Sequence, residues 1–108
     1  MQVYNEENKI EIEVYDSLKR VIDPELGINI VDLGLIYKIT YTNENVIHIT
    51  MTLSTKGCPM SDVIMDNMDS VLSEKFPEIK HHIELVWEPQ WNTSFVTPEG
   101  KKALGLTF

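Results

Sequence analysis

The chain has 108 residues, 43% of them hydrophobic and 24% charged, which is ordinary usage for a folded protein and argues against a disordered segment or a fibrous repeat. This length suits one hydrophobic core and is too short for two, so we expect a single domain over residues 1–108. A formal net charge of −8, with an isoelectric point near 4.7, repels phosphate backbones and anionic lipid surfaces, so neither nucleic acid nor a membrane is an expected partner.

Two further features bear on the compartment. No run approaches the roughly 20 consecutive apolar residues that cross a bilayer, and the first residues have neither the basic start nor the apolar stretch of a signal peptide. A single cysteine, Cys58, cannot form an internal disulfide. We therefore expect a cytoplasmic protein.

The first predicted helix has Asn5 as its cap, acidic residues in its first turn, and ends before Asp23-Pro24. Its apolar residues recur at helical spacing at Ile10, Val14, Leu18, Val21 and Ile22. Residues 23–34 then contain a proline, two glycines and alternating acidic and aliphatic residues, which indicates an ordered loop. Loops of this length in small domains are often functional.

Two strands follow. Residues 35–41 and 46–53 are rich in β-branched and aromatic residues and are separated by a turn at 42–45, which predicts an antiparallel hairpin. In the second strand, aliphatic residues alternate with His48, Thr50 and Thr52, so one face of that strand should be polar.

The second half of the chain predicts two helices and a third strand. Apolar residues at helical spacing from Ile64 to Phe76 predict a helix that ends before Pro77, with its methionines filling the core. Alternation over residues 79–87 predicts a strand, and Thr97-Pro98-Glu99 predicts the cap and first turn of a short helix that stops at Gly105.

This order of elements predicts an α+β, two-layer fold of order α-β-β-α-β-α, with the helices packed on one face of a three-stranded sheet. The second and third strands should run parallel because a helix joins them. The strand order, and with it whether the sheet is mixed, stays open.

Cys58 lies in Thr55-Lys56-Gly57-Cys58-Pro59, between a predicted strand and a predicted helix. Gly57 permits a tight turn and Pro59 suits the first turn of a helix, so the thiol should lie at or beside a helix cap. Unpaired N–H groups and the helix dipole there lower a thiol pKa below its usual value of about 8.5. A functional thiolate and a cysteine that only fills space both remain open.

Several chemistries can be weighed for this thiol. Cys58, His48 and an acid such as Asp23 or Asp32 could formally make a hydrolytic triad, but no nucleophile-elbow or protease motif surrounds the cysteine. A zinc site would need paired ligand spacings, and neither CxxC nor CxxH is present. One thiolate cannot hold an iron–sulfur cluster unaided, although a second chain, an external thiol or a partner protein could complete the ligand shell. The pattern is compatible with transient cluster handling.

Two other groups of residues are candidates for function. Asp23, Glu25 and Asp32 place carboxylates around the long loop, where acids commonly cap turns. Trp87 and Trp91 flank Pro89 at the end of the third strand, which predicts a rigid aromatic corner that is either a lid on the core or an exposed docking patch.

Four motifs stand in order along the chain, at Val21–Gly27, Ile30–Ile36, Thr55–Pro59 and Val86–Trp91. Taken together, they resemble the SufT/PaaD-like family, catalogued as domain of unknown function 59, which includes subunits of the eukaryotic cytosolic iron–sulfur targeting machinery. The resemblance implies a role in maturing iron–sulfur proteins, with Cys58 as the family's cysteine, Asp23 and Pro24 as its Asp-Pro turn, and Trp87, Pro89 and Trp91 as its aromatic corner. Lys56 and Gln90 stand where the family often has proline. The chain also ends at Phe108 without the cysteine-rich extension of phenylacetate-type members, which favours a SufT-like role.

We therefore expect a non-catalytic accessory factor of iron–sulfur cluster assembly that carries a cluster transiently, or delivers it, through Cys58. Asp23, Pro24, Glu25, Asp32, Thr55, Gly57 and Pro59 are the accompanying loop candidates. Its expected partners are scaffold or carrier proteins and client apoproteins, and a homodimer could share the cluster between chains. The alternative is an adaptor that binds no metal and docks through Trp87, Trp91 and the acidic loop. A KH-type RNA-binding module is disfavoured by the acidic charge and the missing GxxG loop.

Overall fold

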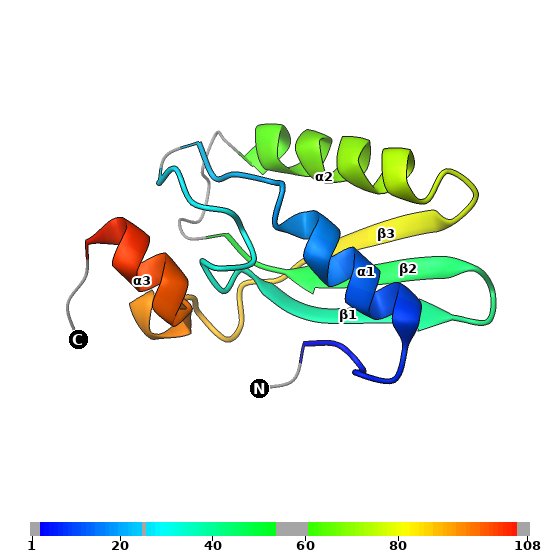
Figure 1. The fold of residues 1–108 in the computed structure, drawn as a ribbon, viewed down its shortest axis with the longest axis horizontal. Coiled ribbons are helices and arrows are strands. Elements are labelled where there is room, and N and C mark those ends of the chain that lie inside the picture. The colour runs from blue at the N-terminus through cyan, green and yellow to red at the C-terminus, as the bar shows by residue number, and fades with distance from the viewer. Residues whose placement is uncertain (1–2, 25, 54–60, 106–108) are drawn as a thin grey trace.

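A computed structural model describes residues 3–24, 26–53 and 61–105. The elements are α1 (Lys9–Leu18), β1 (Ile36–Thr42), β2 (Val46–Met51), α2 (Ser61–Lys75), β3 (Lys80–Leu85), a 3₁₀ helix η1 (Thr93–Phe95) and α3 (Pro98–Leu104). Figure 1 shows this arrangement, and it confirms the α-β-β-α-β-α order expected from the sequence.

The sheet has the strand order β1-β2-β3. β1 and β2 are antiparallel and are joined by the predicted turn, in which Asn45 takes a positive φ of 63°. β2 and β3 are parallel, with Ile49 opposite Ile83. The sheet is therefore mixed, which answers the question that the sequence left open.

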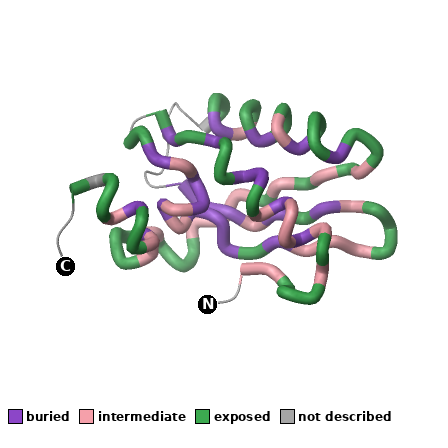
Figure 2. The backbone as a smooth tube through the Cα atoms, in the orientation of Figure 1, coloured by how far each residue is buried: buried purple, intermediate pink, exposed green. Residues whose placement is uncertain are grey.

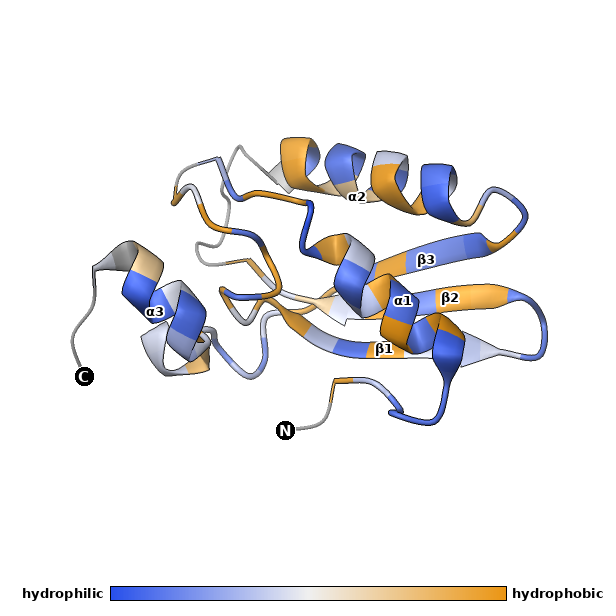
Figure 3. Cartoon of the chain, viewed as in Figure 1, coloured by the Kyte–Doolittle hydropathy of each residue, from blue (hydrophilic) through white to orange (hydrophobic). Residues whose placement is uncertain are grey.

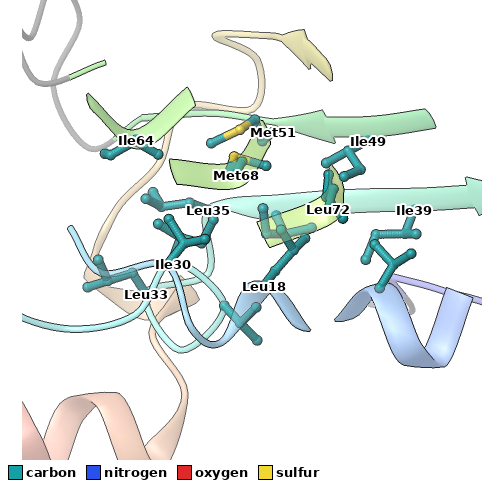
Figure 4. Close-up of a cluster of buried hydrophobic side chains, with 14 of the residues drawn as sticks. Leu18, Ile30, Leu33, Leu35, Ile39, Ile49, Met51, Ile64, Met68 and Leu72 are labelled. Carbon is teal, nitrogen blue, oxygen red and sulfur yellow. The ribbon is translucent and has the colours of Figure 1, made fainter. Parts of the chain in front are cut away.

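One hydrophobic core lies between one face of the sheet and the helices α1 and α2. α1 and α2 cover this face, whereas α3 lies beyond one end of the sheet (Figure 1). Figure 2 shows the buried positions meeting between these layers, and Figure 3 shows hydrophobic and hydrophilic residues alternating along α2. Figure 4 shows the packed side chains, among them Leu18, Ile39, Ile49, Met51, Ile64, Met68 and Leu72.

Met60, Met65 and Met68 are the methionines expected to fill the core. Met68 is fully buried and Met65 packs against the core, as expected, and Met60 lies outside the described residues. Among the described residues, no helix is both long and apolar enough to cross a membrane.

The boundaries of α1 differ from the prediction. The cap is Asn8, whose Oδ1 accepts a hydrogen bond from the Glu11 N–H at 3.1 Å, and Asn5 instead forms a turn before the helix. Both asparagines are good caps. Glu11 does not complete a capping box with Asn8, because its carboxylate accepts from the N–H groups of Asn5 and Tyr41, while the Asn8 N–H donates to the Asn5 carbonyl. The helix ends at Leu18, before the predicted end. Val21 and Ile22 therefore belong to the loop that follows, where Val21 is buried and Ile22 is 45% exposed.

Candidate functional site

Most described site candidates meet at one end of the sheet. Here the loop between α1 and β1 contacts the segment after β3 and the start of α3 (Figure 1). The contacts join residues that are far apart in the chain, with separations of 58 residues for Trp91 to Leu33 and 65 for Thr97 to Asp32.

Asp23 organises the first turn of this loop. The residue is 4% exposed, and its Oδ1 accepts a hydrogen bond from the Leu26 N–H at 3.2 Å. Its backbone N–H donates to the Ile28 carbonyl at 2.9 Å, and its carbonyl accepts from the Gly27 N–H at 2.8 Å. The Asp23 carboxylate therefore holds the turn closed. Pro24 is exposed beside it, and Glu25 lies outside the described residues.

Asp32 connects the loop to α3. Its Oδ1 accepts from the Thr97 hydroxyl at 3.1 Å, and its Oδ2 accepts from the Asn29 side-chain amide at 2.7 Å. The Asp32 carbonyl also accepts from the Thr97 N–H at 2.8 Å. Gly100 lets α3 approach this closely, because a Cβ there would lie 2.8 Å from the Asp32 carbonyl oxygen. We call these contacts the Asp32 clasp, consisting of Asn29, Asp32, Thr97 and Gly100.

The aromatic corner packs onto the same loop. Trp91 Nε1 donates to the Leu33 carbonyl at 2.6 Å, and the Tyr37 hydroxyl donates to the Pro89 carbonyl at 2.8 Å. Trp87 and Trp91 are both partly buried and pack against the core. Of the two alternatives left open by the sequence, the geometry is that of a lid on the core.

A family model described as "Iron-sulfur cluster assembly protein" matches residues 11–82. The chain belongs to this family. It is 37% identical over 101 residues to the Fe-S protein maturation auxiliary factor YitW of Bacillus subtilis, covering 93% of this chain and 98% of the relative. It is 46% identical over 88 residues to the Fe-S protein maturation auxiliary factor SufT of Staphylococcus aureus, covering 81% and 99% of the two chains.

A solved structure of this iron-sulfur cluster assembly family has the same fold. The domain of unknown function DUF59 from Bacillus anthracis superposes with a TM-score of 0.84 at 41% identity, covering 90% of this chain and 92% of that one. This match confirms the α+β fold and the family resemblance read from the motifs.

The cysteine expected for this family lies outside the described residues, as do Thr55, Gly57 and Pro59. α2 begins at Ser61, shortly after Cys58 in the chain, and the helix start predicted at Cys58 and Pro59 lies outside the described residues. Within residues 3–24, 26–53 and 61–105, no group of three or more His, Cys, Asp and Glu side chains could hold a metal ion.

Gly34 and Tyr37 are residues that the sequence analysis did not single out. Gly34 has φ of 77°, and a Cβ there would lie 2.2 Å from the Phe95 carbonyl oxygen, so only glycine fits. Tyr37 is buried and its ring packs edge-on against Phe95 at 5.9 Å. Burial raises the pKa of the Tyr37 hydroxyl, which therefore keeps the proton that it donates to Pro89. Gly34 belongs to the Ile30–Ile36 motif, but nothing in the sequence specifies its close approach to Phe95.

An apolar cavity of about 460 Å³ lies beside the contact between Gly34 and Phe95. Its lining includes Tyr15, Val31, Ile36, Phe95 and Thr97. Burial raises the pKa of the Tyr15 hydroxyl, and the nearby Tyr4, Asp32, Asp16 and Glu99 raise it further. The surroundings of this cavity are therefore negative.

Proposed function

We propose that this protein is an accessory factor in the maturation of iron–sulfur proteins and that Cys58 supplies a thiolate to a cluster in transit. The observation that carries the proposal is family membership over residues 11–82, a range that includes Cys58. The YitW and SufT relatives are named auxiliary factors, which supports an accessory and non-catalytic role.

The chemistry follows from the number of thiols. A cluster takes four ligands, mostly thiolates, and each chain offers one. The remaining ligands must come from a second copy of the chain, a small thiol or a partner protein. Delivery then exchanges one thiolate for another at iron, so the cluster keeps its oxidation state and the released Cys58 is ready for another cluster.

Three exposed apolar side chains support a docking surface near the family motifs. The large hydrophobic residues most exposed among those described are Ile22 at 45%, Leu26 at 38% and Val63 at 43%. Ile22 and Leu26 flank the Asp23 turn, and Val63 lies in the first turn of α2, shortly after Cys58 in the chain. Exposed apolar residues next to functional motifs suit contact with a partner protein. We propose that carriers and client apoproteins contact these residues.

The same observation supports a second candidate, an adaptor that binds no metal. In that case the docking residues would suffice and the thiol would be dispensable. The hydrogen-bonded position of Trp91 favours Ile22, Leu26 and Val63 over the aromatic corner as the contact residues.

Replacement of Cys58 by serine distinguishes the two candidates. In cells that lack the native protein, C58S should fail to restore the activity of iron–sulfur client enzymes while keeping the wild-type thermal unfolding midpoint. Anaerobic reconstitution with iron and sulfide should give thiolate-to-iron absorption in the wild type and none in C58S, with the molar mass measured in the same samples.

Replacement of Val63 by aspartate is the complementary test. Under the cluster-transit proposal both V63D and C58S lose client maturation. If C58S restores clients fully and V63D does not, the adaptor replaces the thiol proposal.

A further inference from the structure

One face of the sheet is left uncovered by α1 and α2. The cross-strand register places residues that are polar, apart from Val46, on it in rows: Thr40, His48 and His82 in the middle row, Lys38, Thr50 and Glu84 in the next, and Thr42, Val46 and Lys80 on the other side. None of these residues is buried. We call this surface the open face.

Two histidines lie side by side at the centre of the open face. His48 of β2 is directly opposite His82 of β3, and their ring centroids are 6.0 Å apart at an interplanar angle of 66°. Both side chains are exposed. The third histidine, His81, points to the core face instead, where its Nε2 is hydrogen-bonded to Asp69 of α2.

We propose that His48 and His82 form a two-histidine site for a divalent transition-metal ion such as Cu²⁺, Ni²⁺ or Zn²⁺. Imidazole nitrogen suits these ions. A metal–nitrogen distance of about 2.0–2.1 Å places two imidazoles on one ion with their ring centres about 5–6 Å apart, so small side-chain rotations allow the pair to bind. Water completes the coordination, and of these ions Cu²⁺ should bind with the highest affinity.

The backbone holds this pair in place. The β2–β3 ladder fixes both Cα positions, so binding has to order only the side-chain torsions of two residues. The charged neighbours on the open face are Lys38, Lys80 and Glu84. Lys80 and Glu84 stand on either side of His82 in β3 and have opposite charges, so Lys38 leaves these three neighbours with one net positive charge.

The site is independent of the proposed cysteine chemistry and can be tested without it. Untagged full-length protein carrying C58S is titrated with Cu²⁺ or Ni²⁺ by calorimetry, and Cu²⁺ spectra are recorded by electron paramagnetic resonance. We expect one ion per chain and a hyperfine pattern from two nitrogens. The ion should also raise the unfolding midpoint, because it binds the folded state.

Single alanine substitutions assign the ligands. H48A and H82A should each weaken binding by at least tenfold and reduce the pattern to one nitrogen. H81A is the matched control, since it removes an adjacent histidine from the opposite face, and it should bind like the parent. Equal weakening by H81A, or unchanged binding in H48A or H82A, would overturn the site. Neither result would affect the proposal for Cys58, which is absent throughout.

Discussion

Replacing Asp32 with alanine tests whether the Asp32 clasp holds α3 against the loop. The substitution removes both acceptors, those that bind the Thr97 hydroxyl at 3.1 Å and the Asn29 amide at 2.7 Å. It leaves the backbone bond from the Thr97 N–H to the carbonyl of residue 32, and it leaves the cap that Thr97 provides to the Gly100 N–H. The change therefore isolates the side-chain part of the clasp.

The magnitude follows from the number and exposure of these bonds. A hydrogen bond to a charged group contributes about 1.5–3 kcal/mol. Asp32 is only half-buried, so water replaces part of each bond and D32A should lower the free energy of unfolding by about 2–3 kcal/mol. D32N keeps one acceptor and gains a donor but loses the charge, so its loss should be about 1 kcal/mol.

Urea unfolding followed by circular dichroism measures both variants. The matched control is D16A, because the Asp16 side chain is 67% exposed and its ion pair with Lys19, at 3.7 Å, lies on the surface. Such pairs contribute little, so D16A should unfold like the wild type. Hydrogen exchange should also show faster exchange at the Lys101 N–H in D32A, since that group is bonded within the first turn of α3. If D32A unfolds at the same urea concentration as D16A, the clasp does not stabilise the fold.

Three further variants test the same region and the start of the chain. G34A should lower the free energy of unfolding by at least about 2 kcal/mol, because of the positive φ and the clash with Phe95; wild-type thermal stability would contradict the close contact between Gly34 and Phe95. The raised pKa of Tyr15 gives stability that is present below pH 10 and is lost as the pH rises through the folded-state pKa. Y15F should therefore make the fall of the urea midpoint at alkaline pH shallower. An unchanged fall would show that ionisation of Tyr15 does not cause it. E11Q leaves one acceptor oxygen for the N–H groups of Asn5 and Tyr41, so it should cost about 1–2 kcal/mol in urea unfolding and speed hydrogen exchange at one of the two; wild-type values would show that the carboxylate is not needed.

Local signals predicted most of the fold. Alternation placed the strands to within two residues at each end, and Thr97-Pro98 with Gly105 located both ends of α3, where Thr97 accepts the Gly100 N–H and Gly105 has φ of 76°. The predicted start of α1 was wrong because two asparagines compete for the cap: Asn8 accepts the Glu11 N–H, whereas Asn5 forms a turn before the helix and donates its N–H to the Glu11 carboxylate.

In the candidate site, local sequence signals predicted which residues matter but not which residues they contact. Asp23, Asp32 and Trp91 could be selected from their motifs, but their contacts could not. The bond from Trp91 to Leu33 spans 58 residues, and nothing near Trp91 in the chain specifies the acceptor. Asp23 and Asp32 hold the loop through hydrogen bonds, in keeping with the expectation that these acids cap turns, and Trp91 packs as part of a lid, whereas the sequence left the aromatic corner open between a lid and a docking patch.

The carboxylate of Glu11 has a consequence for how the sheet can associate. Its Oε2 accepts the Tyr41 N–H at 3.2 Å, while the Val3 carbonyl accepts the Ile39 N–H at 2.8 Å, so the N-terminal segment occupies the outer edge of β1. An unoccupied strand edge is where another chain can add. With β1 closed, β3 is the edge of the described sheet at which growth can occur. Pairing through sheet edges would therefore stop at two copies, and this fold cannot extend into a filament by that route.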